Sequence, residues 1–228
     1  MALAAPARRR LRLLALCRAA GTVGTVDRER RFLWAPGMKQ AEDEKRCEKL
    51  AGYIRLMCTE PGGWCVIGAR GEAAAANAMR SLAWASEIGK SPIDFKVRWE
   101  EELNDERSLR FFCEIRETWT EWKKRWTMVD TPEKPLVVTP HTDVTKLSTA
   151  VVVRHRKFAG AAIKMKAQHD TVLSTAAKAL ATIPSTGREE VGKELSCVIR
   201  WPRLKETEKD EALKMHVFGH VMWRDEGH

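Results

Sequence analysis

The feature that most constrains the fold of this chain is an internal repeat. Residues 49–119 and 146–223 share an ordered series of similar segments. The matching segments are 49–51 with 146–148, 78–83 with 176–181, 98–99 with 200–201, 108–110 with 212–214, and 119 with 223. The offset between the copies grows from 97 to 104 and never decreases, as short loop insertions in one copy would produce. A repeat of this length predicts two similar domains in tandem.

Hydrophobic periodicity predicts the same element order, β-α-β-α-β-β, in each copy. In the first copy the predicted strands are 32–34, 64–67, 95–99 and 109–115, and the helices are 42–58 and 73–85. In the second copy the predicted strands are 136–138, 161–167, 197–201 and 213–221, and the helices are 143–157 and 170–183. The run Val151-Val152-Val153 locally favours a strand, so the helix over it is predicted from the repeat. Pro184 is expected to end the last helix before it.

Two stretches of the first copy, the segment 66–71 and the Ala-rich 76–83, have a fainter echo in the second copy at 163–167 and 174–179. These stretches resemble the Alba family of small nucleic-acid-binding proteins, and they are at least as similar to its bacterial relative, the stage V sporulation protein S family. The resemblance implies an α+β fold made of two tandem Alba-like domains. Each would be a four-stranded mixed sheet with two helices on one face.

The resemblance also implies a set of basic residues that contact nucleic acid from two loops and a hairpin. Carried over by position, they are Lys39, Arg70, Arg98, Lys146, Lys164, Lys166, His169, Arg203 and Lys205. Such residues mainly neutralise phosphates and carry no sequence information. A single Lys or Arg of this set is equally well explained as a solvated surface residue.

The first copy departs from the family pattern because its hairpin tip is acidic. Residues 100–106 hold five carboxylates, and the first loop adds Glu42-Asp43-Glu44. Carboxylates repel a phosphate backbone. The first domain is therefore expected to contact basic protein, and the second domain, with a balance of +5 over residues 136–223, is expected to face nucleic acid.

A Trp-rich segment separates the copies. Trp119, Trp122 and Trp126 lie at i, i+3 and i+7, so they share one helical face. Two interpretations stay open. One is a linker helix packed on a neighbouring domain, and the other is a surface that binds a partner or stacks RNA beside Lys123, Lys124 and Arg125.

The charge of the chain is concentrated at its start. The formal net charge is +9, and residues 1–31 contribute +6 of it. The segment from Met1 to Val26 is rich in Arg, interleaved with Leu, and has no acid before Asp27. This composition predicts mitochondrial targeting. The alternatives are plastid targeting and an ordinary basic tail.

No pattern in the chain predicts catalysis, a cofactor or a metal site. The turn Gly68-Ala69-Arg70-Gly71 lacks the terminal Gly-Lys-Ser/Thr of a P-loop. The six cysteines include no C-x-x-C pair and are expected to be buried hydrophobes. His216 and His220 are predicted to lie on a strand, where four residues span about 13 Å, too far for one metal ion.

These observations predict a non-catalytic RNA-associated subunit of an organellar ribonucleoprotein, best matched by an accessory protein of the mitochondrial ribosome. The alternatives are a free organellar RNA- or DNA-binding protein, and a structural subunit of another mitochondrial complex, such as a respiratory one. The expected divisions are 1–31, a targeting segment or basic extension; 32–116, domain one; 117–135, the linker; 136–223, domain two; and 224–228, a tail. The two domains are hypothesised to pack on each other as an intramolecular pseudo-dimer.

Overall fold

The structure is a computed structural model. It describes residues 31–37, 42–89, 91–101, 107–127, 135–157, 162–167, 169–186, 193–200 and 217–225. Within this part of the chain the protein is an α+β fold with one mixed sheet.

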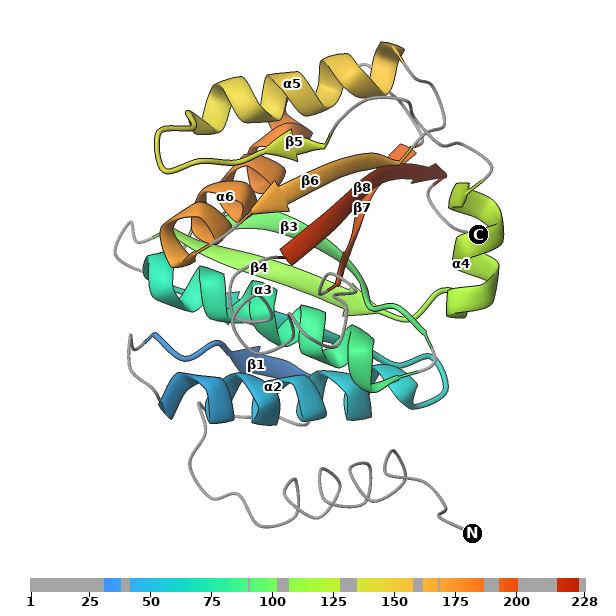
Figure 1. The fold of residues 1–228 in the computed structure, drawn as a ribbon. Coiled ribbons are helices and arrows are strands. Elements are labelled where there is room, and N and C mark those ends of the chain that lie inside the picture. The colour runs from blue at the N-terminus through green and yellow to red at the C-terminus, as the bar shows by residue number, and fades with distance from the viewer. Residues whose placement is uncertain are drawn as a thin grey trace, which may run out of the picture.

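The elements follow the predicted order in both halves, with one helix between them (Figure 1). The first half contains β1 (Phe32–Trp34), α2 (Glu42–Thr59), β2 (Trp64–Ala69), α3 (Gly71–Ile88), β3 (Asp94–Glu101) and β4 (Arg107–Glu114). The helix α4 (Trp119–Thr127) follows. The second half contains β5 (Leu136–Val137), α5 (Val144–Lys157), β6 (Ile163–Ala167), α6 (Asp170–Thr186), β7 (Lys193–Arg200) and β8 (Val217–Asp225).

The strands of both halves form one continuous sheet in the order β1-β2-β4-β3-β7-β8-β6-β5. In each half the first two strands pair in parallel and the other pairs are antiparallel. The halves therefore have the same topology. They differ from two separate four-stranded sheets because β3 and β7 pair with each other.

The junction between β3 and β7 has the register of a two-fold contact. Phe95 pairs with Cys197, which stands 102 positions later, the same offset that relates Arg98 to Arg200 in the repeat. A residue that faces its own equivalent in an antiparallel pair lies on a two-fold axis, as in an isologous dimer interface.

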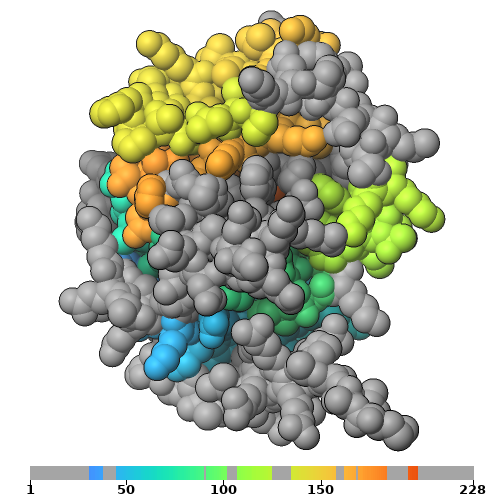
Figure 2. All heavy atoms as spheres, in the orientation of Figure 1, coloured from blue at the N-terminus to red at the C-terminus, as the bar shows by residue number. Residues whose placement is uncertain are grey.

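Four helices cover one face of the sheet in the order α2-α3-α6-α5, each packed on the next (Figure 1). Figure 2 shows α5 and α6 in contact along the upper part of the molecule and α4 apart from them at the side. The two central helices are Ala-rich because each has a neighbour on both sides and the sheet beneath. Small side chains such as Ala76 and Ala177, both fully buried, allow this close approach.

Two ion pairs join the central helices across the junction. Arg80 pairs with Asp170, and the Lys178 ammonium lies 3.1 Å from the Glu72 carboxylate. Asp170 follows Glu72 by 98 positions, as Lys178 follows Arg80, so the two pairs occupy equivalent places in the two halves. Partly exposed pairs of this kind stabilise by about 0–1 kcal/mol each, and their main contribution is to fix the register of α3 on α6.

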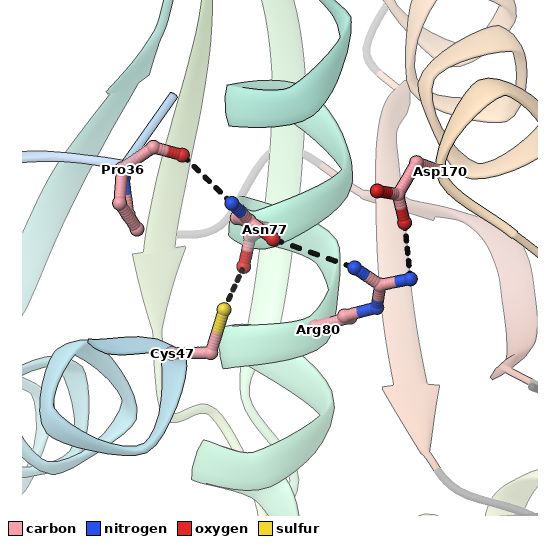
Figure 3. A network of polar contacts seen from close by, with 5 residues as sticks. All are labelled: Pro36, Cys47, Asn77, Arg80 and Asp170. Carbon is pink, nitrogen blue, oxygen red and sulfur yellow. Dashed lines mark hydrogen bonds and ion pairs between the residues drawn. The ribbon is translucent and has the colours of Figure 1, made fainter. Parts of the chain in front are cut away.

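Asn77 extends this junction into the first half (Figure 3). Its amide nitrogen donates to the Pro36 carbonyl at 2.8 Å, and its side-chain oxygen accepts from Arg80 at 3.4 Å. The Cys47 thiol of α2 donates to the Asn77 carbonyl at 3.8 Å. The segment after β1, α2, α3 and α6 are therefore held by one polar network centred on α3.

A single apolar core lies between the helices and the sheet, and it includes residues of both halves. Ile54 and Phe111 from the first half and Leu173 and Ile199 from the second are at most 2 % exposed. The helix predicted over Val151 to Val153 is confirmed as α5, in which Val151 is fully buried and Val153 is 55 % exposed. Tertiary packing of one helical face therefore outweighs the local strand preference of this run.

The prediction that Pro184 ends α6 was wrong, since α6 continues to Thr186. A proline loses the hydrogen bond that its nitrogen would have donated and crowds the carbonyl four residues earlier, but near the end of a helix this disturbs a single turn, and α6 runs on to Thr186. Within the part of the chain that the structure describes, no helix combines the length and apolar character needed to cross a membrane.

The same left-handed turn precedes the second helix in both halves. Gly71 has φ +78° and His169, 98 positions later, has φ +63°. Glycine adopts this conformation at no steric cost, whereas other residues lose roughly 1–2 kcal/mol. The second half therefore carries strain that the first half avoids.

We expect His169→Gly to stabilise the protein by about 0.5–1 kcal/mol, since the relieved strain exceeds the added freedom of the unfolded chain. The matched change Gly71→Ala should destabilise it by about 1 kcal/mol. Its Cβ would meet no atom within 4 Å, so only the backbone conformation is penalised. Urea unfolding monitored by circular dichroism measures both changes. Equal signs for the two variants would contradict the shared geometry.

Candidate nucleic-acid interface

The face of the sheet turned away from α2, α3, α5 and α6, called here the outer face, carries the basic residues of the strands. In β6, Ile163, Met165 and Ala167 are buried in the core, and Lys164 and Lys166 alternate with them. In β3, Phe95 and Val97 are buried in the core, so Lys96 and Arg98 point to the outer face. Period-two alternation therefore places lysines and arginines of both halves on one surface.

The structure brings only some of the sequence-predicted residues together. Arg98, Lys164 and Lys166 share the outer face, and Arg70 joins its edge at the start of α3. Lys146 and His169 are exposed at the starts of α5 and α6, in the helix layer. The remaining three predicted residues, Lys39, Arg203 and Lys205, lie outside the described part of the chain.

Lys146 is placed by a helix cap. Asp143 precedes α5, and its carboxylate accepts the backbone N–H of Lys146 at 2.8 Å. The backbone carbonyl of Asp143 accepts from Leu147, which closes the first turn. The Lys146 side chain therefore lies at the exposed start of α5, in the helix layer, on the opposite side of the sheet from Lys164 and Lys166.

Arginines lie over aromatic rings along the outer face of the first half and its edge. The pairs, with the distance from guanidinium carbon to ring centroid, are Arg31 over Trp64 at 5.8 Å, Arg70 over Trp34 at 4.7 Å, Arg98 over Phe112 at 5.9 Å, and Arg110 over Phe32 at 4.6 Å. Flat rings beside planar cations suit nucleic acid, since bases stack on both and phosphates pair with the cation.

The carboxylates of this region lie next to arginines. Arg110 Nε is 3.6 Å from the Glu100 carboxylate, Arg107 is 3.5 Å from Glu101, and Arg116 is 2.5 Å from Glu114. These pairs offset part of the acidity that the sequence suggested for the first half. The rest of the acidic tip, residues 102–106, and the acidic loop side chains of 42–44 lie outside the described residues.

The helix α4 is held against one end of the sheet. It begins with a capping box, in which Thr118 Oγ1 accepts the Glu121 N–H at 3.3 Å and the Glu121 carboxylate accepts the Thr118 N–H at 2.7 Å. Trp122 packs on Ala162 and Val198 and is 4 % exposed. The half-buried Trp119 donates from its indole nitrogen to the Ser86 carbonyl at 3.3 Å.

Of the two interpretations of the tryptophans, the partner-binding one stays a prediction. Trp122 is covered by the protein itself, which agrees with the linker-helix interpretation for that residue. The side chain of Trp126 is not described. What α4 does expose is Lys123 and Lys124, at the end of the outer face that also carries Lys164.

The described cysteines are buried free thiols. Cys58, Cys65 and Cys113 cluster in the first-half core, with the thiols of Cys58 and Cys65 3.7 Å apart. Hydrogen bonding to Cys65, followed by burial, raises the pKa of Cys58, and burial raises the pKa of Cys113 and of Cys197. They remain protonated, as structural thiols do. The described residues include no group of three or more side chains able to hold a metal ion.

Sequence reasoning missed much of this surface. Lys96, Arg110, Phe32, Trp34, Trp64 and Phe112 were not singled out, although Phe32 and Trp34, like Arg110 and Phe112, stand two apart on strands. Residues two apart on a strand point to the same face of the sheet. Which of these residues meet across strands depends on the order of the strands in the sheet, which the spacing does not give.

No model of a protein family, no curated protein and no solved structure gives a significant match to this chain. The resemblance to the Alba family therefore stays a prediction.

Proposed function

We propose that this protein is a non-catalytic RNA-associated subunit of an organellar ribonucleoprotein, built from two Alba-like modules joined as an intramolecular pseudo-dimer. The observation that carries the proposal is the outer face, where both halves place basic side chains and where arginines of the first half lie over exposed or half-buried aromatic rings.

The basic positions of the outer face extend across the sheet. Lys96 and Arg98 lie on β3, and Lys164 and Lys166 lie on β6, with β7 and β8 between them. At the usual strand spacing this separation is about 14 Å. Exposed Lys123 and Lys124 continue it at one end. These are two basic groups and not one continuous row, since Ser196 and Val198 of β7 between them are at most 1 % exposed and Trp122 packs on Val198. Each group can neutralise phosphates of an RNA strand.

The two equivalent halves support the modular part of the proposal. They share element order, strand pairing, the left-handed turn before the second helix, and the ion pair between the central helices. A copied module that once formed a symmetric dimer would leave these features. The Arg-rich, acid-poor segment before residue 27 supports an organellar address, which fits the mitochondrial ribosome best.

The test is sedimentation of the tagged full-length chain from lysed mitochondria. A subunit of the mitochondrial ribosome should sediment with ribosomal RNA, and mild ribonuclease treatment should move most of it to the top of the gradient. If ribonuclease does not change the sedimentation, and the chain co-sediments with membrane complexes after detergent extraction, it would be a structural subunit instead. A slow-sedimenting protein that still binds RNA would be a free binder. Absence of the chain from mitochondria would remove the organellar assignment.

A further inference from the structure

A buried carboxylate lies at the junction of β3 and β7, where the two halves meet in the sheet. Asp94 of β3 and Ser196 of β7 are each 1 % exposed, and the Ser196 hydroxyl donates a hydrogen bond of 2.7 Å to Asp94 Oδ1. Their strand neighbours Phe95 and Cys197 belong to the core between helices and sheet, so this pair lies on the outer face. Hydrogen bonds to a carboxylate are about twice as strong as those between neutral groups.

Asp94 and Ser196 occupy equivalent positions of the repeat. Ser196 stands 102 positions after Asp94, the offset that also relates Phe95 to Cys197. Phe95 faces Cys197 in the register of β3 on β7, so the two-fold axis of the junction passes between them. Asp94 and Ser196 each lie one residue before that axis on their own strand. Each therefore contacts the residue that replaces it in the other half.

The same junction between two copies of one half would lack this match. An exact two-fold pairing sets each residue near the axis against its own copy. Two first halves would bring two Asp94 carboxylates together in a buried place, where one of them is forced to take up a proton. They would also set two Phe95 rings against each other, and overpacking of this kind is destabilising. Two second halves would set Cys197 against Cys197 and leave a cavity in place of the Phe95 ring.

The ion pairs between the central helices do not distinguish like from unlike halves. Glu72 and Asp170 are acids at equivalent positions. The bases that pair with them, Lys178 and Arg80, are equivalent to each other as well. Two copies of either half would therefore still match an acid of one helix with a base of the other. The distinction depends on the side chains where β3 meets β7.

We propose that Asp94 and Phe95 make the β3 edge of the first half specific for the β7 edge of the second, so that copies of this chain do not assemble through like halves. The β3 edge accepts a strand that offers a hydroxyl donor and a small side chain, as Ser196 and Cys197 do. A chain whose halves each paired with their own kind would join two neighbours and extend without closing. Such specificity depends on the cost of the wrong pairing as well as on the contacts of the right one.

The first test compares urea unfolding of full-length variants at position 196. Ser196→Asp sets a carboxylate against Asp94 and should lower the ratio of folded to unfolded chain on the order of 100-fold. Ser196→Asn has the same size, but its amide can donate to Asp94, so its loss should be at least about 10-fold smaller. Equal losses for these two variants would overturn the inference, because size and not charge would then decide the pairing.

Exchange of the two residues, Asp94→Ser with Ser196→Asp, tests their equivalence. The exchanged chain again has one acid and one hydroxyl at the junction, so it should recover most of the stability that Ser196→Asp loses. It also keeps the test usable if Ser196→Asp alone does not fold. An exchanged chain that is no more stable than Ser196→Asp would overturn the inference.

The second test identifies which halves pair when the chain refolds. Wild type and Asp94→Ser are refolded from urea with oxidised glutathione, and disulfide-linked peptides are identified by mass spectrometry. Pairing of second halves brings Cys197 of two copies together, and their two thiols form one disulfide as glutathione disulfide is reduced to two thiols. Wild type should stay monomeric by light scattering and give little of this link. In Asp94→Ser every pairing offers two serines, so the link should rise at least about 5-fold.

As much of the Cys197 link in wild type as in Asp94→Ser would overturn the inference. Neither test contains RNA, so this failure would leave the proposed function in place. Loss of RNA association in the sedimentation experiment would, conversely, leave the specificity of the junction in place.

Discussion

Replacing Phe95 by Ala should lower the free energy of unfolding by about 3–5 kcal/mol, and it should destabilise both halves of the chain. Phe95 is 2 % exposed, packs on Phe111 at 6.1 Å between ring centroids, and faces Cys197 of the other half. The side chain fills the place where the two halves meet in one sheet. Truncation leaves a cavity that neither half can close alone.

The measurement is urea unfolding with a separate probe in each half. Cys113 and Cys197 are buried at 2 % and 1 % exposure, so alkylation of each, read by mass spectrometry, reports the opening of its own half. Because the core is a single cluster, both thiols should become reactive at the same urea concentration and shift together in the variant. The change Val153→Ala, at a site 55 % exposed, should move neither by more than about 0.5 kcal/mol.

Since small proteins are stable by only about 5–15 kcal/mol, the milder Phe95→Leu keeps the test usable if the alanine variant does not fold. It should cost roughly 1–1.5 kcal/mol and show the same coupled shift. A Cys197 transition that stays in place while the Cys113 transition moves would mean that the halves unfold independently. The continuous core would then not act as one cooperative unit.

Most elements of the fold could be predicted from the sequence because their signals are local. Alternation in Ile163 to Ala167 and the apolar face of α2 gave the strand and the helix directly. The helix α5 was predicted from the repeat, although the local propensity of Val151 to Val153 favours a strand. The end of α6 was missed because proline weakens a helix without fixing where its final turn lies.

The pairing of β3 with β7 could not be predicted, because any strand edge presents the same backbone groups. The one available signal was the charge spacing. Glu72 and Arg80 are eight apart, as are Asp170 and Lys178, so antiparallel helices can match each acid to the other helix's base. Two such pairs at equivalent positions point to the junction once the repeat is known.

The candidate site was harder to predict for the same reason. Arg110 reaches Phe32 and Trp34 only because β4 and β1 both flank β2. Helical spacing predicted that Trp119, Trp122 and Trp126 share one face of a helix. It did not predict whether that face is exposed to solvent or packed on the protein. Burial of Trp122 on Val198 is a tertiary fact.

Charge reversal of two lysines on the outer face should abolish most RNA association. We expect Lys164→Glu combined with Lys166→Glu to weaken binding to single-stranded RNA on the order of 100-fold near 0.1 M salt. Losing two phosphate contacts lowers the slope of log K against log salt by about 1.4, which corresponds to about 25-fold weaker binding at that salt. The new carboxylates also repel the phosphates. Both side chains are half-buried on a strand face opposite the core, so the fold should tolerate the change. Filter binding over a salt series measures both quantities.

The matched control is Lys146→Glu combined with Arg156→Glu. These residues lie on α5 in the same half, are exposed, and undergo the same change in net charge. If binding depended only on the total charge of the second half, both double variants would lose affinity equally. If the outer face is the contact surface, the α5 variant should lose only a few-fold, through weaker long-range attraction, and keep its salt slope. Greater loss in the α5 variant would move the interface to the helix layer, where Lys146 and His169 lie, and would contradict an RNA-binding outer face.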